Sequence, residues 1–331
     1  MRKEFEIIGV RGVLKALQDT RKNTEVIREA YLSHGRQLTV NPLSSFLRFP
    51  DKPLCRIIAL PAFINYSDRK TGIKWISSFP GNKQHGLARA SAVLILNDYE
   101  TGYPEVCMEG SLISAARTAA SAVLAAETVF EGNFESASIG FCGAGFISQH
   151  ILRHFVGNGW KIGKVRVFDQ FSEASNRFQD EMKTEGIEDL EIVDSSSELI
   201  RSSDIIVFAT DALKPHVFDA GLFSHNPLVL HISLRDLGVE VISQAVNITD
   251  DINHAVREGT SLHLTKQEVG HQDFIKGTLF DLLSEAKLPS RQAPVIFSPF
   301  GLGVLDIALA SHVLQIARAQ KLSVKIEDFF T

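Results

Sequence analysis

The chain has 331 residues, of which 44% are apolar and 22% charged, and this length is enough for roughly two domains of about 150 residues each. Its formal net charge of -5 argues against nucleic acid or an anionic membrane as a partner. Cys55, Cys107 and Cys142 are far apart and show no metal-ligand spacing. We therefore expect no metal site and a reducing compartment.

The N-terminal segment "MRKEFEIIGV" has basic residues but no long apolar core and no small-residue cleavage site, so no signal peptide is predicted. The longest stretch of low polarity is "GSLISAARTAASAVLAAE", residues 110–127. Arg117 interrupts it, and its many Ser and Ala residues disfavour a membrane span. A cytoplasmic protein is expected.

The first third of the chain predicts a mixed α and β unit. Residues 23–37 have apolar side chains at helical spacing, with Asn23 or Thr24 available as the N-cap. Strand-like runs follow at 56–62, 72–77, 91–96 and 105–109. The turn signal "NDYETGYP" between the last two indicates a hairpin in an antiparallel sheet.

A small-residue helix at 112–127 then leads into a repeating pattern of strands and helices. The predicted strands are 136–141, 164–169, 190–194, 203–210, 227–233 and 293–298, and the clearest helices are 147–156 and 172–183. Short buried strands that alternate with helices are typical of a parallel, doubly wound α/β sheet. A last helix at 304–320 closes the chain and is free to return to the first domain.

The stretch "ASIGFCGAGFISQH" contains a G-x-G-x-x-S pattern formed by Gly143, Gly145 and Ser148. It lies between a predicted strand and a predicted helix, as a dinucleotide-binding motif requires. The first glycine permits the tight turn, the second lets the backbone approach a pyrophosphate, and the helix N-terminus offers N–H groups to the phosphates. Ser148 is small enough for the packing that a third glycine normally serves. A plain glycine-rich turn is the alternative.

Asp169 ends the next predicted strand, 26 residues after Gly143, where the usual spacing is about 20. Its carboxylate can accept hydrogen bonds from both adenosine ribose hydroxyls and would repel a 2′-phosphate. No arginine follows it directly, so NAD is favoured over NADP as the cofactor. If the glycines form only a turn, Asp169 is a helix-capping acid.

Two lone cations lie in apolar segments. Arg117 is surrounded by small apolar residues, and a buried guanidinium is costly unless it meets an anion. It is either a clamp for a carboxylate or phosphate, or part of a structural ion pair with a residue such as Glu109.

Lys74 shares a predicted strand face with Gly72 and Ile76. It can hold a carboxylate or take part in proton transfer, or it is a solvated edge-strand lysine.

Acidic and histidine residues at element ends are weaker candidates. Asp236 follows the strand "LVLHIS", and ligands of open α/β sheets bind beyond the carboxyl ends of strands. It is therefore a candidate general acid or base, with a turn aspartate as the alternative. Asp306 is interpreted as a helix-dipole partner and His231 as a packed residue. No G-x-S-x-G motif or cysteine pair indicates a hydrolase or thiol chemistry.

Several stretches together resemble the ornithine cyclodeaminase/μ-crystallin family. They are "GIKW", "TGYP", "ISAARTAASAVLAA", the G-x-G-x-x-S loop and "FSPFGLGVLDIA", in this order over nearly the whole chain. Within the family, "RASAVLILNDYETGYP", "VFDQFSEASNRF" and "RDLGVEV" are most similar to a siderophore-pathway branch of N-(2-amino-2-carboxyethyl)-L-glutamate dehydrogenases, which produce 2,3-diaminopropionate.

The resemblance implies a Rossmann NAD-binding domain at 116–303 and a mixed α+β substrate-binding and dimerisation domain at 1–115 with 304–331, in a homodimer. It implies Lys74 and Asp236 as catalytic residues, and Arg48, Lys74 and Arg117 as ligands of a small, amino-acid-derived substrate. The residues that it places around the cofactor are Arg117, Thr118, Gly143, Gly145, Phe146, Ile147, Ser148, Asp169, Gln170, Thr210, the segment Leu230 to Ser233, and Ser298 to Gly301.

Two departures bear on the reaction. Ornithine cyclodeaminases have a glutamate where this chain has Ile58, and their "GGDCPGKTE" loop is here "SLRDLGVE". Both argue against cyclisation of ornithine. The leading hypothesis is oxidation of N-(2-amino-2-carboxyethyl)-L-glutamate to 2,3-diaminopropionate and 2-oxoglutarate. The alternatives are an ornithine cyclodeaminase, a ketimine reductase or alanine dehydrogenase, and a non-catalytic NAD(P)H-binding protein of the μ-crystallin type.

Overall fold

The computed structural model describes residues 4–66, 69–131, 135, 137–285 and 292–330. The chain divides into two compact units, which are called unit 1 (Met1–Arg117 with Leu302–Thr331) and unit 2 (Thr118–Gly301). Each boundary falls two residues from the one expected from the sequence. The first boundary lies inside the helix α3, Ser111–Val129, which begins in unit 1 and ends in unit 2.

Unit 1 is built on a mostly antiparallel sheet. Its strands are β1 (Phe5–Ile8), β2 (Thr39–Val40), β3 (Ser45–Phe49), β4 (Lys52–Ile64), β5 (Lys70–Ser78), β6 (Ala90–Asn97), β7 (Pro104–Glu109) and β16 (Val324–Ile326). Their order is β16-β1-β7-β6-β5-β4-β2, and β3 also pairs with β4. β6 and β7 form the predicted hairpin, closed where Asp98 N donates to Tyr103 O at 2.9 Å.

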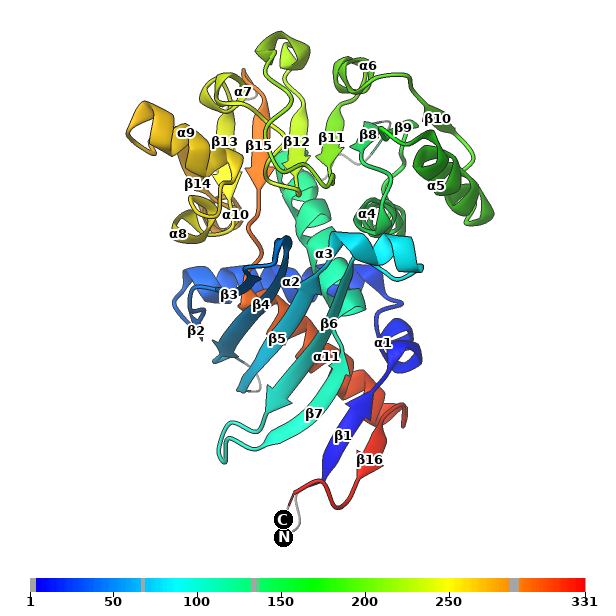
Figure 1. Ribbon diagram of the computed structural model, residues 1–331, viewed down its shortest axis with the longest axis vertical. Helices are drawn as coiled ribbons and strands as arrows, with labels where there is room; N and C mark the ends of the chain where they lie inside the picture. The colour runs from blue at the N-terminus through cyan, green and yellow to red at the C-terminus, as the bar shows by residue number, and fades with distance from the viewer. Residues whose placement is uncertain (1–3, 67–68, 132–134, 136, 286–291, 331) are drawn as a thin grey trace. The chain divides into compact units, whose positions relative to one another are not determined.

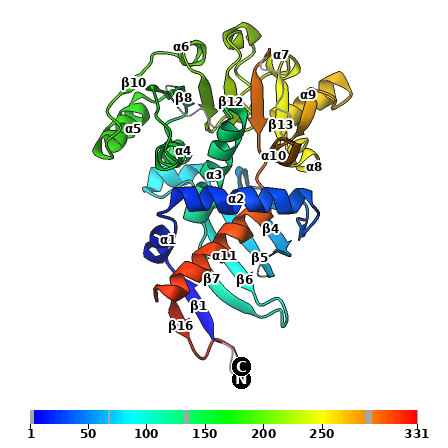
Figure 2. The same ribbon diagram turned by 180° about the vertical axis from the view of Figure 1, so that it is seen from behind.

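Helices cover one face of this sheet. They are α1 (Val10–Ala16), α2 (Thr20–Gly35) and α11 (Gly303–Ala319). A short 3-10 helix, Pro80–His85, connects β5 to β6. α11 packs against β4, β5 and α2, so the predicted return of the last helix to the first part of the chain is confirmed. Figure 2 shows the two long helices across the sheet, and Figure 1 shows the opposite sheet face.

The predicted N-cap of α2 was wrong. The helix begins one turn earlier, where the Asp19 side chain accepts a hydrogen bond from Lys22 N at 2.9 Å. Asn23 and Thr24 are buried inside the helix, and their side chains donate to Leu17 O and Thr20 O. A cap-type residue therefore fits in the first turns of a helix when its side chain finds a local carbonyl.

Unit 2 is a doubly wound α/β unit. Its strands are β8 (Ser138–Cys142), β9 (Lys164–Phe168), β10 (Leu190–Ile192), β11 (Ile205–Phe208), β12 (Leu228–His231), β13 (Val246–Thr249), β14 (Ile275–Thr278) and β15 (Val295–Ser298). All described pairs are parallel, in the order β10-β9-β8-β11-β12-β15-β13-β14. The chain reverses direction across the sheet at β8, so the switch point lies between β8 and β11.

The predicted α/β class and its six parallel strands are confirmed. β11, β12 and β15 are buried at every position, as expected of strands covered on both faces. The sequence analysis missed β13 and β14, which have only four residues each and contain Asn, Thr, Lys and Gly. Their pairing within the sheet determines these strands more than their own propensity does.

The helices of unit 2 flank this sheet (Figure 1). They are α4 (Phe146–Gly157), α5 (Ser172–Thr184), α6 (Ser196–Arg201), α7 (Val239–Ser243), α8 (Ile252–Ala255), α9 (Ser261–Val269) and α10 (Leu279–Glu285), with a 3-10 helix at Ala220–Phe223. α5 buries Ser175, Phe178 and Met182 on one side, and the Phe178 ring packs 5.6 Å from that of Phe141 on β8.

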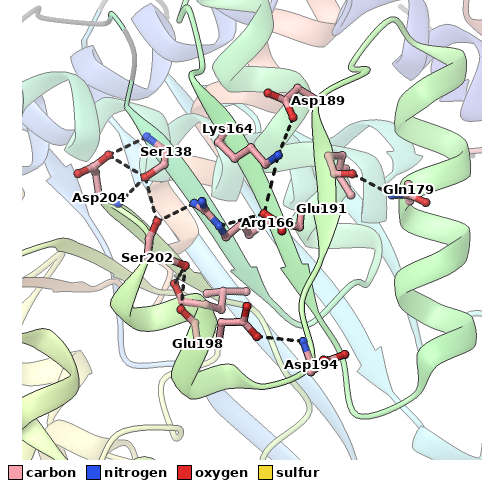
Figure 3. Close-up of polar contacts among 12 residues, drawn as sticks. Ser138, Lys164, Arg166, Gln179, Asp189, Glu191, Asp194, Glu198, Ser202 and Asp204 are labelled. Carbon is pink, nitrogen blue, oxygen red and sulfur yellow. Dashed lines mark hydrogen bonds and ion pairs between the residues drawn. The ribbon is translucent and has the colours of Figure 1, made fainter.

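Polar contacts connect the amino-terminal ends of β8 and β11 (Figure 3). Asp204 Oδ2 accepts hydrogen bonds from Ser138 N at 2.8 Å and from Ser138 Oγ at 2.7 Å. On β9, Arg166 donates to Ser202 O at 2.6 Å and pairs with Glu191 at 3.3 Å. These contacts stabilise the side of the sheet opposite to the strand ends at which ligands bind in this architecture.

Among the described residues, α3 is the one helix with the length and composition of a membrane span. Of that stretch, 83% is buried inside the protein. A core helix with small side chains satisfies the same criteria, and Ala119, Ala120, Ala122 and Val123 are fully buried here.

We predict that Gly72→Ala destabilises unit 1. A Cβ at Gly72 would lie 2.2 Å from Ile95 O on β6 and 3.0 Å from Ile307 Cδ1 on α11. The strand backbone cannot move away without losing its ladder, so a loss of about 3 kcal/mol in the free energy of unfolding is expected. Gly81→Ala is the control, because its Cβ would meet nothing within 4 Å. Equal denaturation midpoints for the two variants would contradict this close packing.

Candidate active site

The glycine loop joins β8 to α4. Gly143 has φ +96°, and a Cβ there would lie 2.5 Å from Ala209 O, so this position requires glycine. Gly145 is the N-cap of α4, has no side chain to cap it, and a Cβ there would meet nothing within 4 Å. The first-turn N–H groups of α4, from Phe146 onward, can therefore bind an anion. Ser148 Oγ donates to Gly143 O at 2.6 Å.

Asp169 lies directly after β9, beside this loop. Its Oδ2 accepts from Ala144 N at 2.9 Å and its Oδ1 from Phe171 N at 3.0 Å. Each carboxylate oxygen has a further acceptor position, so two ribose hydroxyls can still bind. Gln170 is exposed next to it, and Ile147 is half-buried in the first turn of α4. The open loop, the uncapped helix and this acid fit the pyrophosphate and ribose of a dinucleotide.

Unit 1 contains a cluster of three charges, named the Lys74 cluster: the buried Lys74 on β5, the buried Asp306 on α11 and the partly buried Arg117 on α3. Lys74 Nζ lies 2.7 Å from Asp306 Oδ2, and Arg117 Nε donates to Asp306 Oδ1 at 3.1 Å. Lys74 Nζ also donates to Ser114 Oγ at 3.1 Å. Lys74 is 1% exposed and Asp306 0%, so water does not screen these charges.

The Lys74 cluster has two cationic side chains and one anionic one. Burial lowers the pKa of Lys74 to about 8; the charge of Asp306 opposes this shift and that of Arg117 adds to it. A protonated Lys74 leaves one excess positive charge, which favours a bound carboxylate. Neutral Lys74 can accept a proton near pH 8, which suits general base chemistry.

The structure replaces two sequence interpretations here. Asp306 is the common ion-pair partner of Lys74 and Arg117 and not merely a helix-dipole residue. Glu109, the partner suggested for Arg117, instead caps α3, where its oxygens accept from Ser111 N at 2.7 Å and Leu112 N at 2.9 Å. Thr118, the next residue on α3, is buried.

Arg48 is not part of the Lys74 cluster. On the paired strands, Arg48 lies opposite Arg56, whereas Lys74 lies opposite Leu60. The offset of four residues along β4 corresponds to about 13 Å. Arg48 is exposed, and its guanidinium lies 5.3 Å from the centroid of the Phe46 ring.

In unit 2, a second buried carboxylate lies just beyond β12. Asp236 Oδ1 accepts a hydrogen bond from Thr210 Oγ1, and Oδ2 accepts one from Ser233 Oγ. His231 Nε2 lies 3.2 Å from the same Oδ2, and Nδ1 of this ring lies 3.2 Å from Ser298 Oγ. The structure thus brings Thr210, Ser233, Asp236 and Ser298 together at the carboxyl ends of β11, β12 and β15.

Burial alone would raise the pKa of Asp236. The hydrogen bonds from His231, Ser233 and Thr210 and the His231 charge outweigh burial, so the pKa is lowered from its ordinary value. Asp236 is therefore ionised at neutral pH and can act as an acceptor.

The turn that carries Asp236 is strained and firmly held. Leu234 has φ +69°, a left-handed conformation that is unfavourable for a leucine and is often found at functional sites. Leu234 O accepts from Ser261 N at 2.7 Å, and Arg235 donates to Glu258 O at 2.7 Å.

The segment Ser298 to Gly301 follows β15. Asp250 Oδ1 accepts from Phe300 N at 2.9 Å, and its Oδ2 accepts from Gly301 N at 2.6 Å. Gly301 has φ +94°, which explains glycine here. Asp250 therefore holds the segment that the resemblance places beside the nicotinamide.

The sequence analysis gave Asp306 only a helix-dipole role and His231 only a packed position within the cofactor segment, and it did not consider Asp250. A signal for the first two was present, because each is a lone polar residue in an apolar run, "GVLDIALA" and "LVLHIS". A buried polar group of this kind needs a partner, and Lys74 and Arg117 have the same signature. Among the described residues, no group of three or more His, Cys, Asp or Glu side chains could hold a metal ion.

Comparison with known proteins assigns most of the chain to one protein family. The sequence model of the ornithine cyclodeaminase/mu-crystallin family matches residues 27–321. The N-((2S)-2-amino-2-carboxyethyl)-L-glutamate dehydrogenase of Staphylococcus aureus is 30% identical over 310 residues, covering 90% of each chain.

Solved structures show the same fold. The Δ1-pyrroline-2-carboxylate reductase of Thermococcus litoralis, in complex with NADH and L-proline, superposes with a TM-score of 0.89 at 22% identity, covering 97% of this chain and 100% of that one. An archaeal alanine dehydrogenase dimer with bound NAD has a TM-score of 0.87 at 24% identity, covering 98% and 100%.

We predict that Lys74 makes stability rise with pH in the alkaline range. Its pKa is about 8 in the folded protein against an ordinary 10.5, so between these values the unfolded chain binds the extra proton. This contribution is fully present above 10.5 and is lost as the pH falls through 8, and it amounts to up to about 3 kcal/mol.

Denaturant titrations of the wild type and Lys74→Met from pH 7.5 to 10.5 would measure it. The difference in unfolding free energy is expected to grow in favour of the wild type with pH. A difference independent of pH would mean that Lys74 keeps its ordinary pKa in the folded protein.

Proposed function

This chain belongs to the ornithine cyclodeaminase/mu-crystallin family, and on that premise we propose that it is an NAD-dependent dehydrogenase of a secondary amine. The proposed reaction converts N-(2-amino-2-carboxyethyl)-L-glutamate and water to L-2,3-diaminopropionate and 2-oxoglutarate, with formation of NADH. Its substrate is the one for which the dehydrogenase of Staphylococcus aureus, 30% identical to this chain, is named.

The observation that carries this proposal is the Lys74 cluster. One buried cation, one partly buried cation and one buried anion lie together, and a substrate carboxylate would balance the excess charge. Lys74 and Arg117 are the proposed ligands of that carboxylate. The substrate has three carboxylates, so the more distant and exposed Arg48 is the candidate for another of them.

The glycine loop and Asp169 are the proposed binding residues for NAD, with Thr210, Ser233 and Ser298 to Gly301 beside the nicotinamide. Bound NAD supplies the acceptor for the hydride that leaves the glutamyl Cα, which leaves the substrate as a ketimine. The protein must then activate water and return a proton to the departing amine. Asp236, ionised and acceptor-rich, is the proposed proton acceptor, and Lys74 is the second catalytic candidate.

Ile58 supports this reaction over cyclisation. On the paired strands Ile58 lies opposite Ile76, and Leu60 lies opposite Lys74. Directly opposed residues share a sheet face, as do residues two apart on one strand. Ile58 is therefore on the Lys74 face, and it is apolar where the resemblance expects the glutamate of a cyclodeaminase. A terminal amine of ornithine would find no carboxylate at this position.

The test is a coupled assay with the purified protein, NAD and synthetic N-(2-amino-2-carboxyethyl)-L-glutamate. NADH and 2-oxoglutarate are expected in equal amounts. Lys74→Ala and Asp236→Asn are each expected to lower kcat/KM at least about 100-fold, the usual contribution of an acid–base group. Lys161→Ala is the control, because this exposed lysine pairs only at the surface with Glu135 and should keep full activity.

Other outcomes separate the alternatives. Ornithine converted to proline and ammonia without net NADH would identify a cyclodeaminase. Reduction of a cyclic or simple imine, or oxidation of alanine, would identify a reductase or dehydrogenase of those substrates. NAD binding without turnover of any of these would favour a binding protein.

We further propose that unit 1 forms a homodimer through the sheet face opposite α11. This face presents Leu47, Trp75, Val93 and Ile7, each between 41% and 47% exposed. Trp75 lies directly opposite Val93, and Leu47 opposite Ile57, so the apolar side chains continue across neighbouring strands. An apolar surface of this kind is typical of a permanent protein interface.

Trp75→Glu is expected to convert the dimer to a monomer, because it places a charge in the middle of this apolar face. Sedimentation velocity or light scattering gives the mass. Leu213→Glu is the control, since Leu213 is 65% exposed and lies in unit 2. If both variants keep the wild-type mass, the dimer uses another surface or does not form.

A further inference from the structure

The imidazole of His231, which has no role in the proposed function, lies close to both a hydrogen-bond acceptor and a hydrogen-bond donor. Its Nε2 lies 3.2 Å from Asp236 Oδ2, which is an acceptor, and 3.1 Å from Asp236 N, which is a donor. One imidazole nitrogen cannot serve both at once. An unprotonated Nε2 accepts from the Asp236 N–H, and a protonated Nε2 donates to the Asp236 carboxylate. Both states are therefore hydrogen-bonded without movement of the ring.

The other ring nitrogen also has a partner suited to both states. Nδ1 lies 3.2 Å from Ser298 Oγ, and a hydroxyl can either donate or accept. Ser298 is itself positioned on β15, where its carbonyl accepts from Thr249 Oγ1 at 2.8 Å. His231 can consequently gain or lose a proton without leaving a buried polar atom unpaired, which is otherwise costly.

This pair is screened from water. Asp236 and His231 are each 0% exposed, and Ser298 is 1% exposed. The groups that reach Asp236 from a less buried position are the Thr210 and Ser233 hydroxyls. A proton therefore enters or leaves the pair through those hydroxyls and Asp236.

The neighbouring groups do not compete for this proton. Cys142, at the end of β8, faces Asp236, and burial together with the Asp236 charge raises the pKa of its thiol, which stays protonated. The Phe208 ring lies edge-on to His231, with centroids 6.1 Å apart. Arg235, next to Asp236 in the chain, donates to Glu258 O.

We infer that His231 is a proton store for Asp236, and that the two side chains together form the acid–base group of unit 2. This inference rests on the proposed function. A proton released by the substrate ammonium or by the attacking water passes to Asp236 and on to His231 Nε2, which leaves a carboxylate beside an imidazolium. When the C–N bond breaks, the same proton returns through Asp236 to the departing amine. His231 acts through Asp236 and is a positioning residue.

Asp236 needs such a partner, because the hydrogen bonds from the Thr210 and Ser233 hydroxyls stabilise its ionised form. A proton on the carboxylate alone would be held weakly. In model peptides an imidazole binds a proton more tightly than an aspartate by roughly 2.6 pH units.

The test has a readout that does not depend on turnover. Nitrogen-15 NMR of the histidine-labelled full-length protein reports the protonation of each ring nitrogen, and the His231 signal is identified by its loss in His231→Gln. His231 Nε2 is expected to change from unprotonated to protonated within the range of pH 5 to 9. In Asp236→Asn the midpoint should fall by about one pH unit or more, since the stabilising charge is gone. A His231 signal that does not titrate in this range, or that titrates unchanged in Asp236→Asn, overturns the inference.

The kinetic arm uses His231→Gln, which keeps a hydrogen-bonding side chain but cannot store a proton. The acidic limb of the kcat profile is expected to move to lower pH, and kcat should fall at least tenfold, with KM and the fluorescence titration of NADH binding little changed. His271→Gln is the matched variant, because it makes the same change at an exposed histidine of unit 2 that lies 3.6 Å from Asp273, and it should keep the wild-type limb. If the acidic limb of the kcat profile of His231→Gln lies at the same pH as in the wild type, His231 has only a structural role.

The two arms separate this inference from the proposed function. If the wild type does not oxidise the proposed substrate but His231 titrates as described and depends on Asp236, the pair exists and the substrate assignment fails. If turnover is observed but His231 does not titrate, the proposed dehydrogenase activity is supported and the role of His231 as a proton store is contradicted.

Discussion

The carboxylate of Asp306 is fully buried in the first turn of α11, and an isolated charge in that environment would be prohibitively costly. Lys74 from β5 and Arg117 from α3 contact it directly. Three segments that are distant in the sequence therefore meet at one cluster, in which the two cationic side chains compensate the buried charge of Asp306. The return of the last helix to the first part of the chain is thus required by charge as well as by apolar packing.

Two glycines, Gly72 and Gly303, allow α11 to pack closely against the strands near this cluster. α11 can approach β5 because Gly72 has no side chain, and it can approach β4 because a Cβ at Gly303 would lie 3.1 Å from Leu60 O. The close contact removes water from the ion pairs and thereby strengthens them. Packing and electrostatics are not separate contributions here, since the buried charges need the close approach and the close approach would fail around unpaired charges.

The sequence predicted most of this architecture because its signals are local. Strand–glycine–helix–strand–acid order identifies the Rossmann motif, and the short apolar runs at 203–210 and 227–233 identify buried strands. The N-cap of α2, the strands β13 and β14, and the roles of Asp306 and His231 were missed because tertiary contacts determine them. Only the family resemblance implied Arg48 as a substrate ligand, and the sequence could not give its distance from Lys74, because the strand register determines it.

Asp306 and Asp236 are both fully buried carboxylates, but the side chains that contact them differ. Asp306 is contacted by the Arg117 guanidinium, which keeps its proton at any physiological pH, and by the Lys74 amine, so it serves to hold these two side chains in place. Asp236 is surrounded by hydroxyls and an imidazole, groups whose protons can be rearranged. Burial makes each carboxylate depend on its partners, and the chemistry of those partners decides whether it stabilises a charge or transfers a proton. By this reasoning Asp306 is suited to position the two cationic side chains, and Asp236 is the group suited to move protons.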